Sequence, residues 1–423
     1  RGMLVTHARS CVVLMRPLAV GLGLGYGKRG TSPQLQARGT EAQEREGRLM
    51  SGVPFVDLKT QYARLKPQIT EAIQGVLDDG RYILGPAVTR LETELSEYCG
   101  VRHAISCSSG TDAIIMPLIA YGIGPGDAVF VPSFTFTASA EAIILVGASP
   151  VFVDVEDDSF NLDLEDLEEK VAATRAEGKL IPRGILAVDL FGLPADWKEL
   201  NALAHRENLN LVSDAAQSFG GVYEGKRVGA LAPASSTSFF PAKPLGCYGD
   251  GGAVMTDDDE LAELLKSIRV HGQGADRYEI ARIGINGRLD SIQAAILSVK
   301  LSILDEELAA RDHLASVYDE ELKEAVVTPK RLPGRKSAWA QYTIKTDRRS
   351  DIQAALNEAG IPSAVYYPKP MHLQAPYLAY GGGEGSLPVS ESICHEVMSL
   401  PMHPYLPDED ARRIAEVIRK AVA

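Results

Sequence analysis

The chain has 423 residues, of which 45% are hydrophobic, so it can bury a large core. Its formal net charge of −13 argues against a nucleic-acid-binding surface, and no apolar run reaches the roughly 20 residues that span a bilayer. The five cysteines are scattered and lack the spacing of a zinc site or a redox dithiol. We therefore expect a soluble protein with reduced thiols in the cytoplasm, without metal, membrane or nucleic-acid partners.

Residues 1–52 differ in composition from the rest of the chain. They are rich in Arg and Gly and hold no acidic residue before Glu41. An Arg-rich, acid-poor leader is typical of an organelle targeting segment. The apolar stretch at 11–15 is not followed by the cleavage site of a signal peptide. We favour a third interpretation, a translation start placed too far upstream of Met50, and on each of them expect this segment outside the fold.

Helical and strand patterns alternate from residue 53 onward. Segments of helical spacing cover residues 65–77, 88–98, 111–121, 164–173 and 197–206, and short apolar runs cover residues 104–106, 128–131, 150–153, 184–188 and 209–212. This alternation predicts an α/β protein, with a mostly parallel sheet covered by helices on both faces. Ligands of such sheets bind beyond the carboxyl ends of the strands.

The pattern changes near residue 290. There we expect a long helix over 290–308, a strand at 340–344, and helices at 352–359, 390–399 and 408–422. We therefore predict a large ligand-binding domain at 53–300 and a smaller α+β C-terminal domain at 301–423.

Three features could carry chemistry. Asp214 ends an apolar strand, although a helix or turn cap explains it equally well. Lys243 lies among apolar residues before a glycine-rich stretch, where desolvation would make it a usable nucleophile; a lone lysine is otherwise usually a surface residue. Residues 106–113 (SCSSGTDA) form a polar turn into a helix, which can cradle a phosphate or serve as a plain N-cap.

The combination of these features is more informative than any one of them. A lysine amine, a carboxylate at a strand end and a phosphate-binding turn are the groups that pyridoxal phosphate requires. A carboxylate facing the pyridine nitrogen would keep this nitrogen protonated, so that the ring accepts electrons. We therefore predict pyridoxal phosphate as the cofactor.

Four blocks of sequence resemble the DegT/DnrJ/StrS family of nucleotide-sugar aminotransferases. They are residues 109–113 (SGTDA), 132–136 (PSFTF), 214–220 (DAAQSFG) and 237–252 (TSFFPAKPLGCYGDGG). The resemblance extends from about Phe55 to the C-terminus. It implies the fold of the fold-type I pyridoxal-phosphate-dependent transferases.

The family resemblance also implies a role for each matching residue. Lys243 would bear the cofactor and move the proton, and Asp214 would pair with the ring nitrogen. Asn286 would reach the phosphate of the neighbouring subunit, which implies a homodimer with shared sites. The remaining cofactor contacts would be Gln217 near the ring hydroxyl, Phe136 on the ring face, and Gly110, Thr111 and Ser238 at the phosphate.

The substrate contacts are less sharply implied. Arg288 would bind a sugar carboxylate through its guanidinium, with a diphosphate oxygen or a helix terminus as alternatives. Tyr366 and Tyr367 would contact the substrate, or else anchor the core of the small domain. The family often has His where this chain has Tyr366.

The branch of the family that this chain most resembles aminates a UDP-linked 3-keto-N-acetylglucosaminuronate for bacterial surface polysaccharide such as the O-antigen of lipopolysaccharide. The expected donor is glutamate, in a two-stage transamination. The alternatives are a 4-keto nucleotide sugar as substrate, or a non-catalytic homodimer that binds pyridoxal phosphate and acts in regulation. Relatives that act as dehydratases have His in place of the cofactor lysine, and Lys243 argues against that activity.

Overall fold

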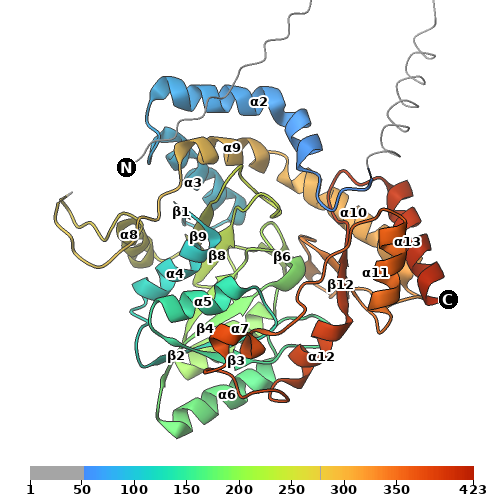
Figure 1. Ribbon diagram of the computed structural model, residues 1–423. Helices are drawn as coiled ribbons and strands as arrows, with labels where there is room; N and C mark the ends of the chain where they lie inside the picture. Colours follow the sequence, from blue (N-terminus) through green and yellow to red (C-terminus); the bar gives the residue numbers. More distant parts are fainter. Residues whose placement is uncertain (1–51, 277) are drawn as a thin grey trace, which may run out of the picture. The chain divides into compact units, whose positions relative to one another are not determined.

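The computed structural model describes residues 52–276 and 278–423. A seven-stranded sheet lies at the centre of this part of the chain (Figure 1). The strand order is β1-β9-β8-β5-β4-β2-β3, and β9 runs in the opposite direction to the other six strands. The bounds are β1 (His103–Cys107), β2 (Asp127–Pro132), β3 (Ser149–Val153), β4 (Ile181–Val188), β5 (Asn210–Asp214), β8 (Ala234–Ser238) and β9 (Gly252–Thr256). The predicted leader lies outside the described residues, except for Gly52.

Helices cover both faces of this sheet because alternate strand residues enter different cores. Leu186 of β4 packs with α4 (Gly110–Ala120), α5 (Thr137–Leu145) and α8 (Asp259–Ile268). Its neighbours Ile185 and Ala187 pack with α6 (Leu164–Glu177) and α7 (Trp197–Glu207). At the other edge, Ala104 of β1 packs with α3 (Pro86–Cys99) and α9 (Ser291–Leu301), and α2 (Leu58–Asp79) lies on α9. The predicted α/β architecture is confirmed.

Local signals in the sequence begin and end the helices. The side chain of Asp163 accepts hydrogen bonds from the first backbone N–H groups of α6, and Asp258 does the same for α8. Helix α2 ends at Gly80, whose φ of 72° lies in the left-handed region that glycine adopts without strain. These caps fix where each helix starts and stops relative to the sheet.

The C-terminal residues build a second core. It contains Tyr318 of α10 (Leu304–Leu322), Ile352 of α11 (Arg349–Glu358) and Ile414 of α13 (Asp408–Val422), packed on the antiparallel pair β11 (Tyr342–Lys345) and β12 (Val397–Leu400). Figure 1 shows α10, α11 and α13 side by side in orange and red. Val53 joins this core from the other end of the described chain. The division at 53–300 and 301–423 stays a prediction, since residues 52–423 form one compact unit.

Two of the predicted helices are wrong in extent. The helix expected over 290–308 is two helices, because α9 ends at Leu301 and α10 begins at Leu304, with Ile303 at φ −113° and ψ 1°. The helix expected over 390–399 is α12 (Pro388–Glu396), and the chain then extends into β12. There the β-sheet pairing of 397–400 with β11 replaces the helical hydrogen bonds.

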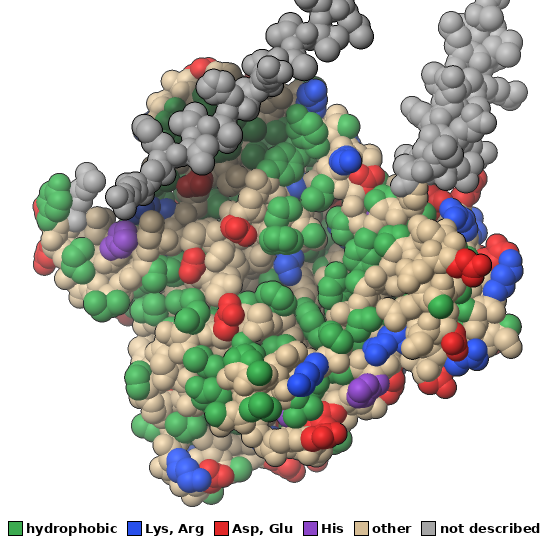
Figure 2. All heavy atoms as spheres, viewed as in Figure 1, with side chains coloured by type: hydrophobic (Ala, Val, Ile, Leu, Met, Phe, Trp, Pro, Cys, Tyr) green, Lys and Arg blue, Asp and Glu red, His purple; other side chains and the backbone are tan. Residues whose placement is uncertain are grey.

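Smaller elements complete the described chain. A three-stranded sheet joins β6 (Val222–Tyr223), β7 (Lys226–Arg227) and β10 (Arg335–Lys336), and short 3-10 helices lie at Leu190–Gly192, Met371–Leu373 and Ala375–Tyr377. Each helix within residues 52–276 and 278–423 is too short or too polar to span a bilayer. On the face in Figure 2, acidic and basic side chains are interspersed rather than gathered into one basic surface.

The four cysteines in the described chain are all free and buried. Cys107 lies in the core under α4 and α5, Cys99 and Cys247 lie in the core around α3 and α9, and Cys394 lies in a third core. This agrees with the expectation of reduced thiols for these four; Cys11 lies outside the described residues.

Candidate active site

Asp214 lies at the carboxyl end of β5, between β4 and β8 in the middle of the sheet. Its side chain is only 6% exposed. One carboxylate oxygen accepts a hydrogen bond from the Ser139 hydroxyl at 2.7 Å, and the other accepts one from the Ala216 backbone N–H at 3.2 Å. Burial raises the pKa of Asp214, while these two donors and the positive charge of Lys243 oppose the rise.

Lys243 follows β8 in a tight loop, close enough to Asp214 for the two charges to interact. The loop closes through a backbone hydrogen bond of 2.9 Å from Lys243 N–H to the Phe240 carbonyl. The side chain is half-buried. Desolvation lowers the pKa of the Lys243 ammonium, and the charge of Asp214 partly restores it. The structure therefore brings together the two residues on which the sequence interpretation depends.

The turn at residues 108–111 lies next to the end of β8. Ser109 caps α4 by accepting a hydrogen bond from Asp112 N–H at 3.1 Å. Gly110 approaches Ser238 so closely that a Cβ added to it would lie 2.5 Å from the Ser238 Cβ. The predicted phosphate residues Gly110, Thr111 and Ser238 thus meet at one helix N-terminus, which favours anions.

Gln217, Tyr367 and Phe136 form an adjoining group. The Gln217 amide accepts a hydrogen bond from Phe191 N–H at 2.7 Å, and its nitrogen donates one to the Tyr367 hydroxyl at 3.2 Å. The rings of Phe136 and Tyr367 are 6.4 Å apart. Phe136 is 54% exposed at the N-cap of α5, so part of its ring is accessible to a ligand. Burial raises the pKa of the Tyr367 phenol, which keeps it neutral.

The last three predicted residues are Asn286, Arg288 and Tyr366. Ser108 N–H donates a hydrogen bond of 3.1 Å to the Gly287 carbonyl, which holds the segment that contains Asn286 and Arg288 beside the phosphate turn. Asn286 is exposed, and the Nε atom of Arg288 is buried without a hydrogen-bond partner among the described residues. Tyr366 packs edge-on against Phe55 at 6.3 Å. No hydrogen bond in the described chain links Tyr366 or Asn286 to the Asp214–Lys243 pair.

Ser139 is the residue that the sequence interpretation missed. It contacts Asp214 from the first turn of α5, 75 positions earlier in the chain. Its one sequence signal is its place shortly after the block at residues 132–136, which the resemblance had already singled out.

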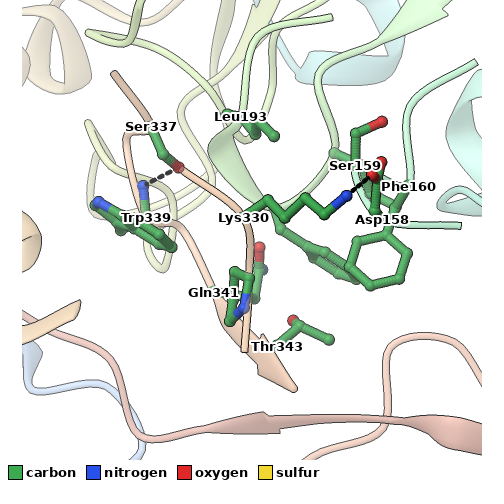
Figure 3. A pocket seen from close by; sticks show the side chains of 12 residues that line it. Asp158, Ser159, Phe160, Leu193, Lys330, Ser337, Trp339, Gln341 and Thr343 are labelled. Carbon is green, nitrogen blue, oxygen red and sulfur yellow. Dashed lines mark hydrogen bonds and ion pairs between the residues drawn. The ribbon is translucent and has the colours of Figure 1, made fainter. Parts of the chain in front are cut away.

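A partly open pocket elsewhere in the fold contains none of the predicted site residues (Figure 3). Residues 158–160, residues 190–193 and the segment 329–343 line it, and Lys330 reaches across it to pair with Asp158. Its internal space of about 30 Å³ is enough for a water molecule but too small for a sugar.

Comparison with known proteins decides the family. Residues 63–419 match the model of the DegT/DnrJ/EryC1/StrS aminotransferase family. The chain belongs to this family. The family prediction is therefore confirmed, and with it the prediction that the protein is an aminotransferase.

Individual members of the family are similar over most of their length. UDP-2-acetamido-2-deoxy-3-oxo-D-glucuronate aminotransferase of Pseudomonas aeruginosa is 46% identical over 84% of this chain and 96% of its own. A family aminotransferase from Brucella abortus is 52% identical, with a TM-score of 0.86 over 88% of this chain and 99% of its own. The structure of NtdA from Bacillus subtilis with bound cofactor PMP is 28% identical, with a TM-score of 0.78 over 87% and 83% of the two chains.

Proposed function

We propose that this family member is a pyridoxal-phosphate-dependent aminotransferase that moves an amino group from glutamate to a nucleotide-linked 3-keto sugar. The observation that carries the proposal is the half-buried Lys243 amine within electrostatic reach of the buried Asp214 carboxylate at the carboxyl edge of the sheet. The Pseudomonas relative acts on a UDP-linked 3-oxo-glucuronate, which supports UDP-3-keto-N-acetylglucosaminuronate as the substrate. The product would serve synthesis of a bacterial surface polysaccharide in the cytoplasm.

The residues at the site fit the cofactor. Lys243 has no hydrogen-bond partner for its amine among the described residues, and Gly110 leaves no room for a side chain beside Ser238. PMP, the cofactor in NtdA, is the aminated form of pyridoxal phosphate. When bound, pyridoxal phosphate supplies an aldehyde carbon for the amino group and a ring that withdraws electrons from the substrate carbon.

Lys243 would hold the cofactor through its amine and, once released, move the proton at the substrate carbon. Desolvation favours the neutral amine that both tasks need, because it lowers the pKa of Lys243. A group that transfers a proton works best with a pKa near the operating pH.

Asp214 would face the ring nitrogen and keep it protonated. At about 4 Å and an effective dielectric of about 20, a carboxylate stabilises a positive charge by about 4 kcal/mol. This would raise the pKa of the ring nitrogen by roughly three units, enough to keep it charged near neutral pH.

The phosphate would lie at the N-terminus of α4, between Gly110, Thr111 and Ser238. Backbone N–H groups and hydroxyls at a helix N-terminus suit a phosphate. Asn286 is exposed on its own subunit, which supports its reaching the phosphate in a second copy. We therefore propose a homodimer with shared sites.

Gln217 and Phe136 would orient the ring. The Gln217 amide is fixed at its oxygen by Phe191 N–H, so its nitrogen is directed toward Tyr367 and the site. It could then donate to the ring hydroxyl, while Phe136 stacks on the ring face.

Arg288 would select the sugar. The buried Nε atom of Arg288 lacks a partner in the described chain, and a guanidinium binds a carboxylate with two parallel hydrogen bonds. A uronate would satisfy it. Tyr366 and Tyr367, from the proposed small domain at residues 301–423, would also contact the sugar.

The test is reconstitution with pyridoxal phosphate, followed by glutamate and a panel of UDP- and dTDP-linked 3-keto and 4-keto sugars. We expect a visible absorption band that glutamate bleaches, and an aminated 3-keto uronate identified by its mass. Replacing Lys243→Ala should abolish both, whereas the exposed Lys198→Ala should change neither. Cofactor binding without bleaching would favour the non-catalytic regulatory alternative, and amination of only a 4-keto sugar would overturn the proposed substrate.

A further inference from the structure

A chain of buried hydroxyl groups leads to the Asp214 carboxylate. Ser139 is fully buried and lies 2.7 Å from one Asp214 oxygen through its hydroxyl. The hydroxyl of Thr135, a side chain that is only 1% exposed, lies 3.2 Å from the Ser139 hydroxyl. Thr135 directly precedes Phe136. The same short segment therefore carries the ring-stacking residue and the start of the hydroxyl chain.

The direction of these hydrogen bonds follows from what each group can do. An ionised carboxylate only accepts hydrogen bonds, so Ser139 donates its proton to Asp214. A hydroxyl has one proton, so the Ser139 oxygen accepts from Thr135. The order is thus Thr135 to Ser139 to Asp214, and each bond polarises the next.

We propose that Thr135 and Ser139 are positioning residues that hold the Asp214 carboxylate ionised and oriented toward the ring nitrogen of the cofactor. This inference rests on the proposed function, because it assigns to two further residues a task at the same site. The segment 135–139 would then act at two places on the cofactor ring. Phe136 would stack on the ring face, and Thr135 and Ser139 would keep the Asp214 carboxylate at the ring nitrogen ionised.

Few groups around Asp214 favour its ionised form, so the hydrogen bond from Ser139 contributes to keeping this carboxylate charged. Burial raises the pKa of Asp214, and the Ser139 hydroxyl, the Ala216 N–H and the charge of Lys243 counter it. The other titratable groups that act on Asp214 are Asp189, beyond the end of β4, and Tyr367, from the C-terminal part. Neither supplies a positive charge. Loss of the Ser139 hydroxyl therefore leaves the carboxylate more easily protonated.

The experiment measures equilibrium binding of pyridoxal phosphate to the cofactor-free protein between pH 5 and pH 9. In the wild type, affinity should fall on the acid side as Asp214 takes up a proton. In Ser139→Ala the loss of affinity should begin about one pH unit higher. At a given acid pH the variant should then bind pyridoxal phosphate about tenfold more weakly than the wild type. Thr135→Val keeps the side-chain shape, removes the second hydroxyl of the chain, and should give a smaller shift in the same direction.

The matched control is Thr343→Val. Thr343 and Ser399 form another buried hydroxyl pair, 2.8 Å apart between β11 and β12. This variant removes the same atom from an equivalent environment and should leave the pH dependence of cofactor binding unchanged. In an Asp214→Asn background, adding Ser139→Ala should give no further pH shift.

Three results separate the possible failures. If the wild type does not bind pyridoxal phosphate, the proposed function falls, and the inference with it. If the wild type binds pyridoxal phosphate but Ser139→Ala and Thr135→Val both lose affinity at the same acid pH as the wild type, only the role of Thr135 and Ser139 is overturned. If Ser139→Ala does not fold, the isosteric Thr135→Val decides the question alone.

Discussion

The ammonium of Lys300 donates a hydrogen bond to the backbone carbonyl of Gly246, in the loop that carries Lys243. Lys300 is 2% exposed on α9, and its ammonium also lies 5.1 Å from the centre of the Tyr248 ring. A Cβ on Gly246 would lie 2.5 Å from the Pro241 carbonyl oxygen, so the loop closes tightly on itself. The loop that carries Lys243 is therefore held in place by a second lysine, which is buried on helix α9.

Lys300→Met should change how stability depends on pH. Desolvation lowers the pKa of Lys300 to about 8, below the ordinary value of 10.5 that the unfolded chain would have. Between these values the unfolded state binds more protons, so the free energy of unfolding rises with pH. The wild type should gain up to about 3 kcal/mol relative to the variant from pH 8 to pH 10.5, measured by urea denaturation. A constant difference over this range would contradict the assignment.

Gly110→Ala should weaken cofactor binding. The new methyl group would overlap the Ser238 side chain at 2.5 Å and push α4 away from the end of β8. We expect a loss of about 1–3 kcal/mol in stability and weaker binding of pyridoxal phosphate, followed by thermal unfolding and absorbance titration. Gly75→Ala is the control, since this exposed position in α2 has open space around it and should gain about 0.5–1 kcal/mol.

Arg288→Met should lower kcat/KM for a sugar that carries a carboxylate more than for a neutral sugar. Removal of the guanidinium leaves a sugar carboxylate without its partner, at a cost of about 1.5–3 kcal/mol, which is roughly 10- to 150-fold in kcat/KM. A UDP-keto sugar without the carboxylate should lose little. Equal losses for both sugars would instead favour the diphosphate as the partner of Arg288. The glutamate half-reaction, followed separately by absorbance, shows whether the donor also depends on this residue.

Asp154→Asn should lower the free energy of unfolding, because Asp154 holds the start of helix α12. The Asp154 carboxylate accepts hydrogen bonds from Val389 N–H at 2.9 Å and from Ser390 N–H at 2.7 Å, at the start of α12. An amide can accept at only one of its two ends, so we expect a loss of about 1–3 kcal/mol in urea denaturation. The nearby Asp157→Asn removes a partly exposed ion pair with Lys345 and should cost less than about 1 kcal/mol. Equal losses would mean that the capping contacts do not matter.

The sequence predicts what depends on local pattern. The apolar runs at 128–131, 150–153 and 184–188 lie within β2, β3 and β4 because buried parallel strands need continuous apolar residues. Strand β8 has no apolar run that would predict it, because it is built of Ala, Ser and Thr. Buried hydroxyls there can bond to the backbone, as Ser236 does at the Ala113 carbonyl and Thr237 at the Ala215 carbonyl. The break between α9 and α10 contains neither Gly nor Pro, so the sequence does not predict it.

The candidate site divides in the same way. Asp214 and Lys243 could be found because each stands at a recognisable place, a strand end and a glycine-rich loop. The contact of Ser139 with Asp214 could not, since it depends on how α5 packs against the middle of the sheet. Pairing across such distances in the chain leaves no periodic trace in the sequence.

The buried cysteines give the fold a built-in set of reporters. Burial raises the pKa of the Cys99, Cys107 and Cys394 thiols, so they react slowly with alkylating reagents while the native packing holds. Because they lie in three different cores, the order in which they become labelled under mild denaturant would reveal which layer opens first. Mass spectrometry of pulse-alkylated peptides could thus follow the unfolding of this enzyme layer by layer without any engineered probe.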